Sequence, residues 1–89
     1  MKLLIVEDEK DLADAIANGL TRQAYSVDVA YDGLKALRLI EVNKYDLLIL
    51  DLNLPGVDGL EICRQVRATD STTGILMLTA RASQDARVM

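Results

Sequence analysis

The feature that most constrains the fold is a run of four aliphatic residues that ends in a single carboxylate, Leu47-Leu48-Ile49-Leu50-Asp51. Pro55-Gly56 follow shortly after and end the apolar pattern. A short apolar run bounded by turn residues predicts a strand that is buried on both faces. Open α/β folds place their ligand sites at the carboxyl ends of such strands, which is the position of Asp51. On this stretch alone, Asp51 could equally begin a turn, since Asp is common there.

The rest of the chain alternates between strand and helix patterns. In chain order, we predict strand 3–6, helix 9–23, strand 26–30, helix 34–42, strand 47–50, helix 58–67, strand 75–78 and the first turns of a helix capped by Ser83. This alternation implies a doubly wound α/β sheet with parallel strands and right-handed crossovers. Polar and apolar residues alternate in 26–30, which is typical of an edge strand. The predicted strand order is therefore 2-1-3-4.

Composition narrows the classes of function. The 89 residues suit one domain, and a net charge of −4 without a Lys/Arg cluster argues against a nucleic-acid surface. No histidine is present, which excludes histidine metal sites and Ser/His or Cys/His catalysis. The single cysteine, Cys63, excludes an internal disulfide and is more typical of a packing residue. The first apolar run is too short for a signal peptide or a membrane span, so we expect a cytoplasmic protein.

Three acidic residues are predicted to meet at one edge of the sheet. The first and third strands are expected to be parallel neighbours, about 4.8 Å apart. Their carboxyl ends carry Glu7, Asp8 and Asp51 at the point where the strand order reverses. Carboxylates so close repel one another unless a cation joins them, and hard oxygen ligands favour Mg²⁺. The sequence therefore predicts a magnesium site there.

A carboxylate beside such a cation has a specific chemistry available to it. Asp51 could act as a nucleophile toward phosphorus and form an aspartyl phosphate. Thr79, which ends the neighbouring strand, could offer its hydroxyl to a phosphoryl oxygen. Taken singly, Glu7-Asp8 could be an acidic pair at a helix start, and Thr79 an ordinary strand-end residue. All four positions fall at the same ends of adjacent strands, and this conjunction favours the functional interpretation.

These residues resemble the receiver domain of two-component response regulators. The resemblance covers the whole chain and is carried by Leu4-Ile5-Val6-Glu7-Asp8, by the run from Asp51 to Gly59 and by Leu78-Thr79-Ala80-Arg81. It implies a flavodoxin-like fold, a phosphoacceptor role for Asp51, and Mg²⁺ held by Glu7, Asp8, Asp51 and the main-chain carbonyl of Asn53. Thr79 would be the switch hydroxyl, and Ala80 the small neighbour that leaves room for the phosphate.

The same resemblance implies partners for the chain. The phosphoryl donor would be a histidine kinase. The Leu-Thr-Ala-Arg motif looks most like that of the subclass whose receivers are fused to a winged-helix DNA-binding domain. DNA would then be bound only through that output domain.

The chain departs from the family pattern after its fourth strand. Receivers continue with the rest of a fourth helix, a fifth strand that follows a phosphoryl-pairing lysine, and a fifth helix. No lysine follows Lys44 here. We therefore expect residues 1–89 to be the N-terminal part of one receiver domain, truncated at its C-terminus and only weakly phosphorylated. We also expect the fourth strand to be an exposed edge that promotes self-association.

Two other functions remain open on the sequence. A metal-dependent phosphohydrolase also works through an aspartyl phosphate, but it usually has a second acid two residues after the nucleophile, where this chain has Asn53. An amide cannot donate and recover a proton as a carboxyl does. The other alternative is an assembly module that keeps the fold and is never phosphorylated. In either signalling or assembly the chain would not be an enzyme.

Overall fold

The computed structural model describes residues 1–51, 54, 57–69, 72–78 and 86–88. Its elements are β1 (Lys2–Val6), α1 (Lys10–Arg22), β2 (Ser26–Ala30), α2 (Gly33–Val42), β3 (Leu47–Asp51), α3 (Gly59–Thr69), β4 (Gly74–Leu78) and β5 (Ala86–Val88). The seven elements up to β4 are those predicted from the sequence, with bounds that agree to within two residues. None of the helices in these described ranges is long and apolar enough to cross a membrane.

The sheet has the strand order β2-β1-β3-β4-β5. The first four strands pair in parallel, which confirms the predicted order 2-1-3-4 and the doubly wound α/β class. β2 lies at the edge, as its alternating sequence predicts. β1 and β3 lie inside, and their apolar residues from Leu3 to Val6 and from Leu48 to Leu50 are buried.

The fifth strand corrects two expectations. Residues 86–88 form an antiparallel strand, with Leu78 opposite Ala86 and Leu76 opposite Val88, and not the first turns of a helix. The helix predicted after Ser83 is therefore wrong for these three residues, while residues 79–85 and 89 lie outside the described part. The expectation of an exposed β4 edge is also wrong over Leu76–Leu78, because β5 pairs with that edge. The predicted self-association depended on an exposed β4 edge, and the pairing with β5 removes that reason for it.

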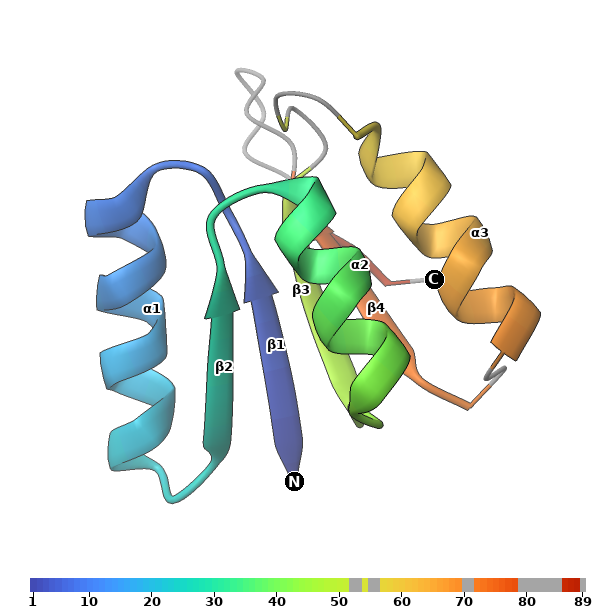
Figure 1. Cartoon of the computed structure of the whole chain (residues 1–89). Coiled ribbons are helices and arrows are strands. Elements are labelled where there is room, and N and C mark those ends of the chain that lie inside the picture. The colour runs from blue at the N-terminus through green and yellow to red at the C-terminus, as the bar shows by residue number, and fades with distance from the viewer. Residues whose placement is uncertain (52–53, 55–56, 70–71, 79–85, 89) are drawn as a thin grey trace.

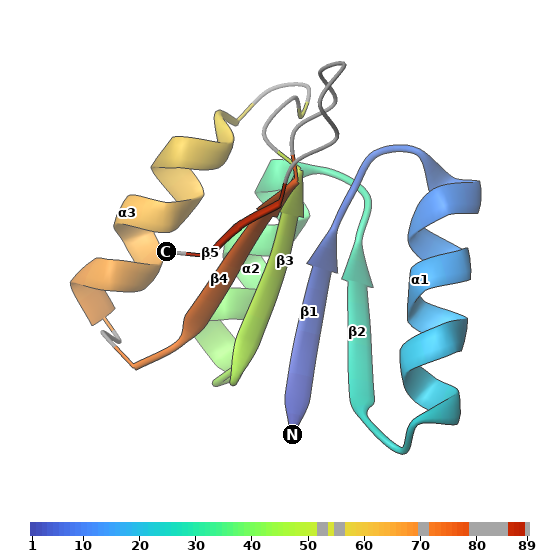
Figure 2. The same cartoon turned by 180° about the vertical axis from the view of Figure 1, so that it is seen from behind.

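Helices cover the two faces of the sheet unequally (Figure 1, Figure 2). On one face, α2 and α3 contribute Ala36, Ile62, Cys63 and Val66 to a core with alternate residues of β1, β3 and β4. On the other face, α1 contributes Ala13 and packs near Ile5 and Ile49. Full burial of one large aliphatic side chain stabilises the fold by about 1.5–3 kcal/mol. The larger core therefore holds the central strands against α2 and α3.

Hydrogen bonds at the amino ends of the strands fix their register. The amide of Asp46 donates to the carbonyl of Lys2 at 2.8 Å, and the amide of Gly74 donates to the carbonyl of Asp46 at 3.0 Å. The buried hydroxyl of Thr73 donates to the carbonyl of Tyr45 at 3.0 Å. With β1, β3 and β4 aligned at this end, their carboxyl ends must also align at the other.

Candidate functional site

Two neighbouring strands bring the predicted acids together. Val6 pairs with Leu50 in the parallel ladder between β1 and β3. Glu7 follows Val6 and Asp51 follows Leu50, so the two acids lie at matching positions directly after this pair. Asp8 follows directly along the chain. The strand order reverses between β1 and β3, since β2 lies beyond β1 and β4 beyond β3. The group of acids therefore lies at the switch point of the sheet, as predicted.

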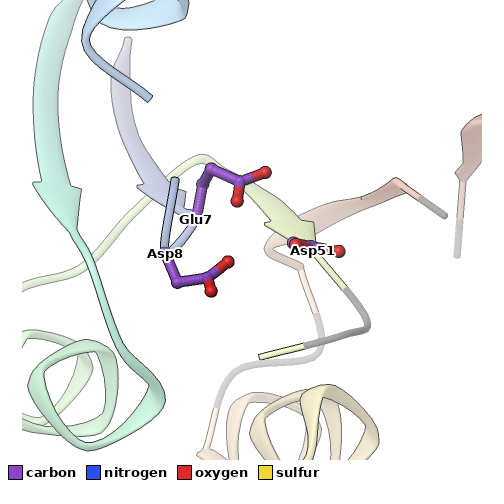
Figure 3. Close-up of side chains that lie close together, drawn as sticks. All are labelled: Glu7, Asp8 and Asp51. Carbon is purple, nitrogen blue, oxygen red and sulfur yellow. The ribbon is translucent and has the colours of Figure 1, made fainter. Parts of the chain in front are cut away.

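The three carboxylates share one small region of space (Figure 3). One oxygen from each of Glu7, Asp8 and Asp51 can be chosen so that all three lie within 4.8 Å of one another. Glu7 is only 6% exposed and Asp51 only 7%, while Asp8 is exposed to solvent. The site therefore has two buried acids and one acid at its open side.

Local hydrogen bonds hold Glu7 in this position. The amide of Glu7 donates to the carbonyl of Ala30 at the end of β2, at 3.0 Å. The amide of Glu9 donates to the Glu7 carboxylate oxygen Oε2, also at 3.0 Å. The part played by the Glu9 amide cannot be predicted from the sequence, because a main-chain donor leaves no residue-type signal. β1 therefore brings Glu7 to the edge of the sheet, and the hydrogen bond from the turn after β1 orients its carboxylate.

The electrostatics of the site favour a cation. Burial is the largest cause that raises the pKa of the Glu7 carboxyl, and the negative charges of Asp51 and Asp8 raise it as well. Against the lowering effect of the Glu9 amide, these causes together bring the Glu7 pKa from 4.5 to about 7. Without a cation, the Glu7 carboxyl is therefore only partly ionised near neutral pH.

The donor set suits a hard divalent cation. All three side chains offer only carboxylate oxygens, and within the described residues no nitrogen or sulfur ligand joins the group. Mg²⁺ prefers a small number of carboxylates and keeps several waters, which the exposed side at Asp8 leaves room for. A cation there would relieve the repulsion that raises the Glu7 pKa.

Three of the predicted site residues, Asn53, Thr79 and Ala80, lie outside the described residues. β3 ends two residues before Asn53, and β4 ends at Leu78, directly before Thr79. The roles assigned to these three residues by resemblance remain predictions.

Comparisons with known proteins all point to one family. Residues 3–89 match the family described as the response regulator receiver domain. The chain is 50% identical over 88 residues to the transcriptional regulatory protein CutR of Streptomyces coelicolor. It is 42% identical over 88 residues to the response regulator MprA of Mycobacterium avium. Both matches cover 99% of this chain, which spans 41% of CutR and 39% of MprA.

Solved structures show the same fold. The response regulator TrrA of Thermotoga maritima, crystallised in complex with Mg²⁺ and BeF, has a TM-score of 0.84 and 33% identity. That match covers 92% of this chain and 71% of TrrA. A response regulator from Burkholderia pseudomallei with a phosphorylated aspartic acid and a calcium ion has a TM-score of 0.84 and 30% identity. It covers 91% of this chain and 48% of that protein.

Proposed function

We infer that Glu7, Asp8 and Asp51 form a Mg²⁺-dependent phosphoacceptor site, on the premise that this chain belongs to the response regulator receiver domain family. The observation that carries the inference is the convergence of the three carboxylates within 4.8 Å at the switch point of the sheet. Glu7 and Asp8 would hold the cation, and Asp51 would both contact it and accept the phosphoryl group.

In the proposed reaction, a carboxylate oxygen of Asp51 attacks the phosphorus of a phosphohistidine. A P–O bond forms while the P–N bond breaks, and the imidazole leaves with the electron pair and takes up a proton. Mg²⁺, when bound, would offset the negative charge of the carboxylates and of the phosphoryl oxygens. Thr79 and the carbonyl of Asn53 would complete the site, in the roles that the family resemblance implies.

The wider proposal concerns partners. We propose a histidine kinase as the donor and a signalling role in place of enzymatic turnover, because an acceptor carboxylate modified once per signal suffices for a switch. The relative CutR is named a transcriptional regulatory protein, which supports an output in transcription for a protein that contains this chain. A cytoplasmic location is part of the proposal, since the chain's one cysteine is typical of reducing compartments. No observation favours the phosphohydrolase or the assembly module.

Beryllofluoride binding tests the proposal, because this anion mimics a phosphoryl group on a carboxylate. We expect calorimetric titration in the presence of Mg²⁺ to show one beryllofluoride bound per chain. Asp51→Asn should abolish this binding, because the amide cannot act as the anionic oxygen ligand of beryllium. The matched control is Glu41→Gln, which removes one negative charge from an exposed position of α2. Equal binding by the native chain and Asp51→Asn would exclude Asp51 as the phosphoacceptor.

A further inference from the structure

A cleft of about 300 Å³ lies between the ends of α2 and α3, where the two helices separate. At its start, α2 is close to the α3 side, since a Cβ atom built on Gly33 would lie 2.7 Å from the Cβ of Val57 and 3.5 Å from Cδ1 of Ile62. Toward their ends the helices are farther apart (Figure 1). The cleft is at the amino end of β3, whereas Asp51 is at its carboxyl end. A cleft of this size is at the lower end of the range for small-ligand sites.

The inner lining of the cleft is apolar and aromatic. Leu48 of β3 and Val66 of α3 are 1% and 3% exposed, and Ile40 of α2 is half-buried. Tyr45 also lines the cleft, and its hydroxyl donates to the Asp28 carboxylate at 2.6 Å, which holds the ring in place. Aromatic rings pack favourably against one another in offset or edge-to-face arrangements. The lining therefore suits a small ligand with an aromatic ring.

The hydroxyl of Thr69, at the end of α3, sets the kind of polar atom that the cleft can bind. It donates to the carbonyls of Gln65 and Val66 at 3.2 Å and 3.3 Å. A hydroxyl has one hydrogen and two lone pairs. Because the hydrogen is directed at the carbonyls of α3, the oxygen offers a ligand the role of acceptor. The matching group on the ligand is therefore a hydrogen-bond donor.

The charges around the cleft favour a neutral ligand. Lys44 lines it, and among the described residues no carboxylate does. The Arg67 guanidinium donates to the carbonyl of Thr73, which also lines the cleft. These two positive charges disfavour a cationic ligand. The cleft also lies at the carboxyl-terminal ends of α2 and α3, whose carbonyls carry partial negative charge and disfavour an anion. A neutral donor meets neither repulsion.

We propose that this cleft binds a small neutral phenol, whose ring packs against Tyr45 and Leu48 and whose hydroxyl donates to Oγ1 of Thr69. The inference uses none of the acidic residues and is independent of the proposed function. For phenol itself we expect a dissociation constant of about 1 mM, which is within the affinity that a ligand of this size can reach. Anisole keeps the ring and the oxygen but has no hydrogen to donate, so it serves as the matched probe.

Titration of the isotopically labelled 89-residue chain with phenol, followed by amide NMR shifts, tests the proposal. Ile40→Phe places a larger side chain in the cleft and should abolish binding. Thr69→Val removes the acceptor and should weaken phenol binding about fivefold, the equivalent of one neutral hydrogen bond, while the affinity for anisole stays unchanged. The control is Thr21→Val, because the Thr21 hydroxyl makes the same kind of bond to the Ala17 carbonyl in α1, at 2.8 Å. It should change neither affinity.

Several results would overturn the proposal. These are shifts that do not saturate or that centre outside the cleft, native affinity in a folded Ile40→Phe, and an unchanged affinity for phenol in Thr69→Val. An equal loss for phenol and anisole, or an equal loss in Thr21→Val, would show that the Thr69 hydroxyl does not accept from the ligand. Tighter binding of benzoate or benzylammonium than of phenol would overturn the neutral class. Circular dichroism checks that each variant is folded, and Thr69→Val, at an exposed position, keeps the test decisive if Ile40→Phe does not fold.

Discussion

Replacing Glu7 with Gln should stabilise the metal-free protein at alkaline pH. Burial, together with the charges of Asp51 and Asp8, raises the pKa of the Glu7 carboxyl from 4.5 to about 7. The Glu7 side chain is 6% exposed, so solvent screens this effect only weakly. A shift of this size is worth about 3 kcal/mol between the protonated and ionised forms. Glutamine is neutral at every pH and keeps an oxygen that can accept from the Glu9 amide.

The sign follows from the direction of the shift. Because the folded-state pKa is raised, the native protein binds the Glu7 proton more tightly than the unfolded chain does. The stability linked to this proton is fully present below pH 4.5 and is lost as the pH rises to about 7. We therefore expect Glu7→Gln to exceed the native chain in free energy of unfolding by about 1–3 kcal/mol at about pH 8 without divalent cations. At about pH 5 the difference should fall to about 1 kcal/mol or less.

Urea unfolding followed by far-ultraviolet circular dichroism measures this difference, since the chain has no tryptophan. At the proposed site, saturating Mg²⁺ would bind the native Glu7 carboxylate and stabilise the native chain more than the variant, so the order should reverse. Glu41→Gln, on the exposed side of α2, should change neither curve. If Glu7→Gln destabilises the metal-free protein at about pH 8, or has the same effect at both pH values, the reasoning is refuted.

Three further predictions follow from single contacts. Tyr45→Phe removes a 2.6 Å hydrogen bond to the Asp28 carboxylate and should lower the free energy of unfolding by about 1–2 kcal/mol, measured by urea unfolding; no change would mean that the bond contributes nothing net. Asp32→Ala removes the cap on the amide of Lys35 and should cost about 1 kcal/mol in the same assay, with an unchanged value counting against the cap. Burial raises the pKa of the Cys63 thiol, so a thiol reagent should modify it much more slowly in the native protein than in urea, and equal rates would contradict its burial.

The sequence was sufficient where one local pattern had one structural meaning. The alternation in residues 26–30 identified β2 as the edge strand, and the apolar runs 3–6 and 47–50 identified the interior strands. These assignments place the carboxyl ends of the first and third strands side by side. They therefore predict that Glu7, Asp8 and Asp51 meet. The site could be predicted because residues that directly follow neighbouring parallel strands lie at the same edge of the sheet.

The remaining features depend on contacts between distant segments. Residues 86–88 pair with β4 as β5, and nothing in these three residues signals a strand. The sequence marks Asp32-Gly33 as a helix start but does not reveal that Val57 lies against Gly33. The repulsion among the three acids was foreseen. That burial is the main cause of the raised Glu7 pKa was not, because burial is a property of the folded chain.

The central claim is that carboxylates from the ends of two strands share one divalent cation beside Asp51. Paramagnetic Mn²⁺ added in small amounts to the isotopically labelled protein tests it most directly, because the ion broadens the NMR signals of the residues nearest to it. The account predicts that the amide signals of Glu7, Asp8, Glu9 and Asp51 disappear first and together, and that excess Mg²⁺ restores them. Broadening spread evenly over exposed acids such as Asp11 and Glu41, with Asp51 unaffected, would contradict it.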